Sequence, residues 1–150
     1  MHRIFGTKEN EHYLDRKGAY LIPIRDGKVA VVRTPKGCFL LGGGIDDGET
    51  DTQCIRRECM EETGYAVEVG ARVCSAEKYG CHPTLGWFHP IQTYYLGSLL
   101  RQERTPAEDD HRLEWVPCEE VRERMFSDMQ AWAITQCVRK MTDAEKKPVR

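Results

Sequence analysis

Several stretches of the chain have the apolar, β-branched and aromatic composition, and one of them (111–116) the alternation of apolar and polar residues, that are typical of β-strands. Two of these stretches, 19–24 and 28–33, flank Asp26-Gly27, a dipeptide that favours the tight turn of a β-hairpin. Three later stretches have the same character and are also expected to be strands: 65–73, 91–100 and 111–116. The last of them stops at Pro117, because proline cannot donate a hydrogen bond to a strand ladder.

Two other stretches carry the signals of helices. The first helix is predicted over 51–63, where Thr50 is a suitable N-cap and Gln53 completes a capping box with it. Gly64 follows this stretch and suits the left-handed conformation that ends many helices. A second helix is expected to begin at Ser127, because the apolar residues after it recur at helical spacing: Met129, Trp132, Ala133, Cys137 and Met141.

The order of these elements indicates the fold class. Only one helix is interposed between groups of strands, which favours an α+β fold with a mixed β-sheet over a doubly wound α/β array. A chain of 150 residues usually forms one domain. We therefore expect a single domain over 1–150, with poorly ordered ends at 1–14 and 142–150.

Composition narrows the classes of function. The chain has 22 Lys and Arg against 24 Asp and Glu, a formal net charge of −2, which argues against a protein that binds long nucleic acid through its phosphates. No stretch approaches the roughly 20 apolar residues of a membrane span. The first residues lack the apolar run of a signal peptide, so a cytoplasmic protein without membrane partners is expected.

The chain has seven cysteines, an odd number without a secretion signal, so we expect reduced thiols rather than a disulfide framework. Cys81, His82 and His89 suggest part of a zinc site. A structural zinc site needs four ligands at recognisable spacing, and the chain has no second cysteine pair to supply them.

The segment 42–65 carries most of the chemical information. At 100° per residue, Glu58, Glu61 and Glu62 fall within an arc of about 100° on one face of the predicted helix. Three carboxylates so close repel one another unless cations are present, and oxygen-only clusters suit Mg²⁺ or Mn²⁺. Such a metal site is suited to phosphate esters or phosphoanhydrides. The alternative is a solvated acidic helix face.

The spacing of the segment favours the metal site, because it resembles the signature of the Nudix hydrolases, G-x5-E-x7-R-E-U-x-E-E-x-G-U, in which U is a bulky apolar residue. Over these 23 residues, seven positions are strict identities, while Cys59 and Tyr65 occupy the two U positions. Cys59 is smaller than the usual aliphatic residue. The identities are Gly43, Glu49, Arg57, Glu58, Glu61, Glu62 and Gly64.

The resemblance implies a fold, a metal and a role for each matching residue. The fold would be an α/β/α sandwich around a mixed sheet, and the cofactor Mg²⁺ or Mn²⁺. Glu61 and Glu62 match the principal metal ligands, and Glu58 matches a ligand that acts as general base in some members. Gly43 would contribute a backbone contact to the metal or to the loop. In the catalytic machinery, Arg57 would orient these glutamates and Glu49 would belong to the same charge network.

The resemblance also implies hydrolysis of a nucleoside diphosphate linked to another moiety, with release of a nucleoside monophosphate. The alternatives are an oxidised or ordinary nucleotide, an ADP-sugar, a dinucleoside polyphosphate, or a nucleotide-sensing module without catalysis. The intact Glu58, Glu61 and Glu62 favour catalysis, because a sensing module is free to lose them. A homodimer is also expected, since many small relatives are dimers.

Substrate contacts and a further catalytic carboxylate lie outside the signature. Aromatic residues after the helix are candidates for stacking on a base: Tyr79, Phe88 and Tyr94. Each is equally suited to the core of the protein. The further carboxylate would be one of Glu108, Asp110 and Glu77, or these are solvated surface acids. The stretch 80–90, with two prolines and two glycines, is a candidate loop over the substrate.

Charge is unevenly distributed along the chain. Residues 46–62 carry a local charge of −5, and the remainder of the chain carries +3. An anionic substrate would therefore meet an acidic site in a slightly basic protein, and cations would have to fill that site first.

Overall fold

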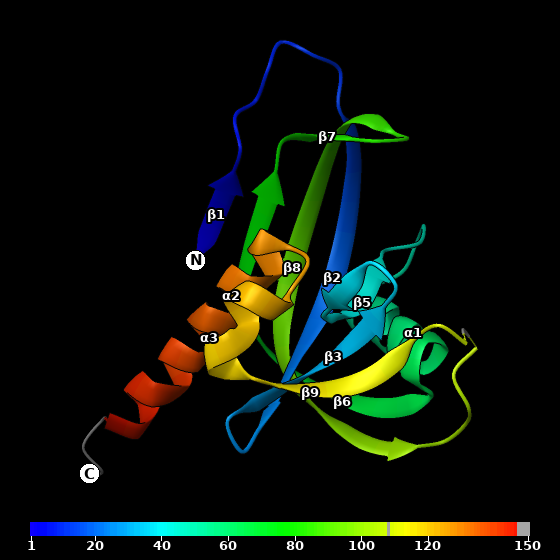
Figure 1. Ribbon diagram of the computed structural model, residues 1–150, viewed down its shortest axis with the longest axis vertical. Helices are drawn as coiled ribbons and strands as arrows, with labels where there is room; N and C mark the ends of the chain where they lie inside the picture. The colour runs from blue at the N-terminus through cyan, green and yellow to red at the C-terminus, as the bar shows by residue number, and fades with distance from the viewer. Residues whose placement is uncertain (108, 147–150) are drawn as a thin grey trace.

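The computed structural model describes residues 1–107 and 109–146, which form a twisted mixed β-sheet with helices on both sides (Figure 1). The strands are β1 (His2–Phe5), β2 (Leu14–Arg25), β3 (Lys28–Thr34), β4 (Gly37–Phe39), β5 (Leu41–Gly44), β6 (Tyr65–Lys78), β7 (Gly80–His82), β8 (Gly86–Gln102) and β9 (Arg112–Pro117). The helices are α1 (Asp51–Thr63), the 3-10 turn η1 (Cys118–Glu120), α2 (Val121–Arg124) and α3 (Asp128–Lys146).

The sheet is built around the long strands β2, β6 and β8. Its main path runs β1-β6-β8-β2-β3-β4, while β5 pairs with β2, β7 with β8 and β9 with β3. The pairs β1–β6 and β2–β8 are parallel, and the others are antiparallel. The mixed sheet and α+β class expected from the sequence are confirmed.

The predicted hairpin is present between β2 and β3. Arg25 pairs with Lys28, and the two residues between them have positive φ, 53° at Asp26 and 74° at Gly27. Positive φ at both turn residues is the conformation that Asp-Gly favours in a two-residue hairpin. The turn therefore fixes the register of β2 against β3.

Helix α1 begins and ends at the predicted residues. The Thr50 hydroxyl accepts from the Gln53 N–H (3.2 Å), and the Gln53 side chain accepts from the Thr50 N–H (2.9 Å), so the capping box is complete. Gly64 has φ of 75°, and a Cβ at this position would lie 1.8 Å from the carbonyl oxygen of Arg104. Only glycine fits this helix end, because both the φ value and the space exclude a side chain.

Two apolar clusters lie on opposite faces of the sheet, and β3 contributes to both. Val29 and Val31 belong to the cluster under α3, whereas Ala30 and Val32 belong to the cluster under α1. Successive side chains of a strand point to opposite faces, so a continuous apolar strand fits only between two covering layers. This arrangement is the expected three-layer α/β/α sandwich.

Several elements differ from the expectation. Strand β1 lies within the stretch expected to be poorly ordered, and α3 continues to Lys146, also within such a stretch. The stretch 80–90 is not a loop, because β7 and the first residues of β8 form a hairpin there, with Gly80 opposite Phe88. It has this form because its residues extend the β8 ladder, which pairs with β2 as far as Leu14 opposite Phe88.

All seven cysteines are free thiols, and five of them are buried. No helix in the described ranges is long and apolar enough to cross a membrane. The pKa of the Cys54 thiol is raised to about 11, chiefly by burial, which keeps the thiol protonated at neutral pH.

Candidate active site

Arg57 on α1 is the centre of a charged network. Its guanidinium donates to both carboxylate oxygens of Glu49, at 2.7 and 3.0 Å, and to the Glu58 carboxylate at 2.9 Å. It also reaches Glu61 at 3.5 Å and the carbonyl oxygen of Gly44 at 3.1 Å. A planar guanidinium with five N–H donors can hold several carboxylates at once, so Arg57 fixes the relative positions of these groups.

Glu49 is held at the turn before α1. Its carboxylate accepts the N–H of Asp46 at 3.0 Å in addition to the bidentate bond from Arg57. The Arg57 guanidinium and the Asp46 N–H hold the pKa of the Glu49 carboxyl at about 2. Glu49 is therefore an ionised anchor for Arg57 rather than a proton carrier near neutral pH.

Glu58 packs directly on the glycine loop of β5. A Cβ at Gly43 would lie 2.6–2.8 Å from the carboxyl atoms of Glu58, so a side chain at position 43 would occupy the place of this carboxyl. Burial raises the pKa of the Glu58 carboxyl, while the Arg57 guanidinium opposes that rise. The glycine thus allows the close approach of the Glu58 carboxyl to the loop.

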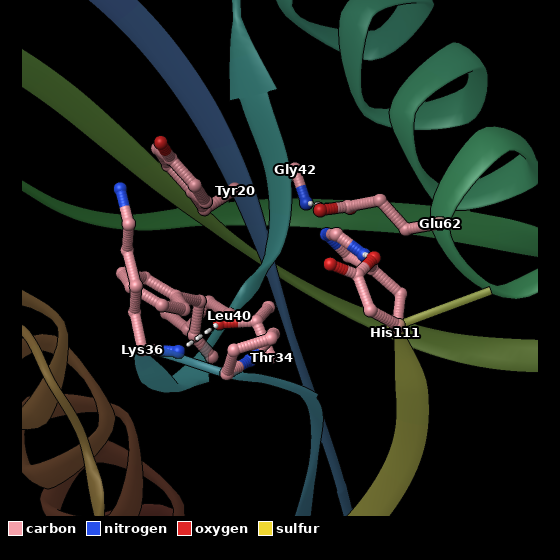
Figure 2. A pocket seen from close by; sticks show the side chains of 10 residues that line it. Tyr20, Thr34, Lys36, Leu40, Gly42, Glu62 and His111 are labelled. Atoms are coloured by element: carbon pink, nitrogen blue, oxygen red, sulfur yellow. Dashed lines mark hydrogen bonds and ion pairs between the residues drawn. The ribbon is translucent and has the colours of Figure 1, made fainter. Parts of the chain in front are cut away.

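Glu62 and Glu61 occupy the other positions on the same helix face. The Glu62 carboxylate accepts the N–H of Gly42 at 3.0 Å, which ties the end of α1 to the glycine loop (Figure 2). Gly42 has φ of 141°, and a Cβ there would lie 2.2 Å from the carbonyl oxygen of Ala19. Glu61 is more exposed than Glu58, with 43% of its side chain accessible.

The donor chemistry of this face fits a hard divalent cation. In the described part of the chain, no three His, Cys, Asp or Glu side chains already converge on one metal position. Glu58, Glu61 and Glu62 nevertheless offer only oxygen donors, and the lack of a side chain at residue 43 lets the Glu58 carboxyl lie directly against the glycine loop. Oxygen donors beside accessible backbone suit Mg²⁺ or Mn²⁺ rather than zinc.

A cavity of about 390 Å³ adjoins this face. Gly42 and Glu62 line the cavity where it meets the helix face that carries the glutamates. The rest of the wall includes aromatic and cationic residues: Tyr20, Phe39, Lys36 and His111. Figure 2 shows Glu62 and His111 side by side, with Tyr20 and Lys36 across the opening. A volume of this size suits a small organic ligand whose charged end lies at the glutamates.

The structure separates the three candidate carboxylates. Asp110 lines this cavity and accepts a hydrogen bond from His111 at 2.8 Å. Glu77 belongs to a different cluster, in which its carboxylate binds His2 at 2.6 Å and His89 at 3.1 Å. Glu108 lies outside the described residues. Of the two that are described, only Asp110 borders the cavity.

The candidate aromatic contacts do not line the cavity. Tyr94 is fully buried in the core, where its hydroxyl donates to Gln92, so it has no surface to offer a substrate. Tyr79 stacks on His89 with ring centroids 4.1 Å apart, and Phe88 contacts His82 through its ring edge. The prediction for Tyr94 is wrong, because alternation along β8 turns its side chain inward.

Sequence reasoning missed the residues that line the cavity, namely Tyr20, Lys36, Phe39 and His111. It also missed Arg16, whose guanidinium would lie 2.9 Å from a Cβ at Gly44. Phe39, Leu40 and Leu41 directly precede the glycines, so the stretch that leads into the signature was the one available sequence signal. The others come from strands and turns that only the fold brings to the site.

Comparison with known proteins gives a consistent result. The NUDIX domain profile matches residues 15–135, which is most of the chain. No functionally curated protein matches the sequence. The range that matches the NUDIX domain includes the glycine loop, α1 and every strand from β3 to β9.

Solved structures share the fold at low sequence identity. A MutT NUDIX hydrolase from Burkholderia pseudomallei is 22% identical, with a TM-score of 0.68 over 82% of this chain and 98% of that one. A UDP-X diphosphatase is 17% identical, with a TM-score of 0.65 over 88% of this chain and 66% of that one. An ADP compounds hydrolase is 16% identical, with a TM-score of 0.58 over 89% and 76% of the two chains.

Proposed function

Because the chain belongs to the NUDIX family, and is a phosphoanhydride hydrolase of that family, we propose that it is a Mg²⁺-dependent pyrophosphohydrolase of nucleoside diphosphate derivatives. The reaction would be attack of water on a phosphorus of the diphosphate, with release of a nucleoside monophosphate. The observation that carries the proposal is the Arg57 network, which holds Glu49, Glu58 and Glu61 together beside the glycine loop.

Each residue of the network has a role in this reaction. Glu58, Glu61 and Glu62, with the backbone at Gly43, would hold the metal. A bound Mg²⁺ supplies charge neutralisation of the diphosphate and lowers the pKa of bound water. Arg57 positions Glu58 and Glu61 and is itself anchored by the ionised Glu49.

The cavity beside Glu62 is the proposed place of the nucleoside. Tyr20 and Phe39 offer ring surface, while Lys36 and His111 offer donors at its rim. Substrate would then lie with its diphosphate at the glutamates and its base in the cavity. The UDP-X diphosphatase and the ADP compounds hydrolase among the similar structures favour nucleoside diphosphates linked to a second group over other phosphate compounds.

The proposal is tested by measuring the rate of hydrolysis by the two variants Glu61→Gln and Glu62→Gln. Each substitution removes one negative charge and keeps the shape, so turnover in Mg²⁺ should fall at least 10–100-fold. The matched control is Glu68→Gln, an exposed glutamate on β6. Equal turnover by Glu61→Gln, Glu62→Gln and the control would rule out this metal face.

A substrate panel distinguishes the remaining alternatives. It contains ordinary and oxidised nucleoside triphosphates, UDP- and ADP-sugars, and a dinucleoside polyphosphate, each assayed for release of nucleoside monophosphate. The compound with the highest kcat/KM identifies the substrate class. Binding of these compounds without turnover of any of them would favour a sensing module instead.

A further inference from the structure

A second cavity lies on the opposite side of the sheet from α1. It has a volume of about 460 Å³ and is bounded by β1, α2 and α3, which lie together in Figure 1. Its wall contains three arginines, two aromatic rings and the amide of a largely buried glutamine: Arg3, Arg122, Arg139, Phe5, Trp132 and Gln136. None of these residues belongs to the face of α1 that carries Glu58, Glu61 and Glu62, here called the glutamate face, or to the cavity beside that face.

The three arginines come from three different elements and point to an anionic ligand. Arg3 is on β1, Arg122 on α2 and Arg139 on α3, and none forms an ion pair within the described part of the chain. Other arginines, such as Arg33 and Arg57, are paired with glutamates. All three residues are exposed, so their guanidinium groups can bind phosphate from solvent through their paired N–H groups.

The acidic side chain in the wall does not neutralise these arginines. Asp128 binds Lys78 through both carboxylate oxygens, at 3.0 and 3.1 Å. The lysine thus compensates the charge of Asp128. The cavity retains the positive charge of its three arginines.

Gln136 is the second, independent observation. It is only 7% exposed, yet its amide has no hydrogen-bond partner among the described residues, although it lines the cavity. Gln130, six residues earlier on α3 and also buried, accepts the Leu40 N–H at 2.7 Å. No buried polar side-chain atom of the described residues lacks a partner, so the Gln136 amide is open to the cavity, where its donors and acceptor can bond a ligand or water.

The apolar part of the wall suits a planar ring. Phe5 and Trp132 meet edge to face, with ring centroids 6.0 Å apart, and the Arg3 guanidinium lies 4.5 Å from the Phe5 centroid. Aromatic faces beside an amide hold a heteroaromatic ring by stacking and hydrogen bonds. The cavity therefore combines a phosphate-binding half with a ring-binding half.

We infer that this cavity is a second ligand site, for a small phosphate monoester with a planar ring, of which a nucleoside monophosphate is the type. Arg122 and Arg139 bind the phosphate with Arg3, Trp132 offers its ring face, and Gln136 bonds the polar edge of the ring. The site does not depend on the proposed hydrolysis, because it shares no residue with the glutamate face.

Calorimetric titration with AMP tests the inference on the full chain in EDTA, where the glutamate face has no metal to attract phosphate. AMP should bind, and adenosine should bind at least tenfold more weakly because it lacks the phosphate. The double variant Arg122→Gln/Arg139→Gln should weaken AMP binding at least tenfold. The matched control Arg101→Gln/Arg112→Gln removes two exposed arginines elsewhere and should leave the Kd unchanged.

Gln136→Leu separates a ligand contact from a structural role. The leucine removes an amide that bonds no protein group, so the ligand-free protein should unfold at a similar temperature while its AMP affinity falls several-fold. The inference is overturned if AMP does not bind, if adenosine binds as well as AMP, or if the double variant keeps its affinity. Loss of AMP binding in Glu61→Gln would instead assign the nucleotide to the glutamate face and also overturn it.

Discussion

Arg57 shows how much of the site depends on the geometry of a single side chain. Its guanidinium joins Glu49 and Glu58 through three hydrogen bonds of 2.7–3.0 Å. A lysine keeps the charge but has a single ammonium group, which cannot hold two carboxylates in a fixed plane. The site therefore depends on the shape of the Arg57 side chain as well as on its charge.

Arg57→Lys should therefore lower kcat about 10–100-fold with a small change in KM, because Arg57 positions the glutamates and is not expected to touch substrate. Steady-state kinetics on the best substrate of the panel measure the split between kcat and KM. Arg56→Lys, the adjacent exposed arginine, is the matched control and should behave as the unsubstituted protein. Equal kinetics for the two variants would show that Arg57 has no positioning role.

Gly43 is a second residue whose role depends on geometry. In Gly43→Ala, the new Cβ would lie 2.6–2.8 Å from the Glu58 carboxyl, and only the end of that flexible side chain has to move. We expect turnover to fall at least tenfold, as for other displaced catalytic groups, while thermal unfolding changes little. Gly80→Ala is the control, because nothing lies within 4 Å of its Cβ. A large loss of stability with normal turnover would contradict this role.

At the scale of elements, β9 is joined to β3 and α2 by one carboxylate. Glu114 on β9 accepts hydrogen bonds from Arg33 on β3, at 2.6 and 3.2 Å, and from Arg124 on α2 at 2.8 Å. Hydrogen bonding by Arg33, aided by the Arg124 charge, lowers the pKa of the Glu114 carboxyl below its usual value.

This pKa shift gives the stability of the protein a defined pH dependence. A carboxyl with a lower pKa in the folded state stabilises the fold above its unfolded pKa of about 4.3, and that contribution is lost as the pH falls through the folded value. Glu114→Gln should therefore lower the free energy of unfolding near pH 7, and its difference from the unsubstituted protein should shrink toward pH 3. Urea denaturation at several pH values measures this, with the exposed Glu123→Gln as control. A difference that is constant with pH would contradict the ion-pair interpretation.

The elements that the sequence predicted are those whose signals are local. Asp26-Gly27 specifies a tight turn because both residues readily adopt positive φ. Thr50 and Gln53 specify the start of α1 through reciprocal hydrogen bonds, so neither the turn nor the helix start needs the rest of the chain. Strand β1 has no such signal, because it pairs in parallel with β6, His2 opposite Ser75, more than seventy residues away. The hairpin at 80–90 was missed because its prolines and glycines are also typical of loops.

The candidate site, too, could be predicted only where its signals are local in the sequence. The glutamates and Arg57 lie within one helix and its preceding loop, so their fixed spacing could be read directly. The cavity walls could not be predicted, because Tyr20, Lys36 and His111 meet only when β2, the β3–β4 turn and the start of β9 come together. The prediction for Tyr94 failed for a related reason, since the register of β8 decides which of its aromatic residues face inward.

At the scale of the whole molecule, charge is divided between the two sides of the sheet. The −5 of residues 46–62 lies at the α1 side, and the unpaired Arg3, Arg122 and Arg139 lie around the cavity at the α3 side. The two sides therefore attract different ions. We expect divalent cations to be drawn to the α1 side, where the carboxylates outnumber the positive charges.

Binding of Mg²⁺ to the folded state alone should consequently stabilise the whole protein. At a hundredfold excess over Kd, mass action adds about 2.7 kcal/mol to the free energy of unfolding, and for a chain of this size that raises Tm by about 5–10 °C. Thermal unfolding with Mg²⁺ and with EDTA measures the shift, which should be smaller in Glu62→Gln and unchanged in Glu68→Gln. An equal shift in Glu62→Gln, or no shift in the unsubstituted protein, would mean that the acidic face does not bind the metal. Because the arginine cavity has no affinity for cations, Arg122→Gln/Arg139→Gln should retain the full Mg²⁺ effect, which separates the two sides of the molecule in a single measurement.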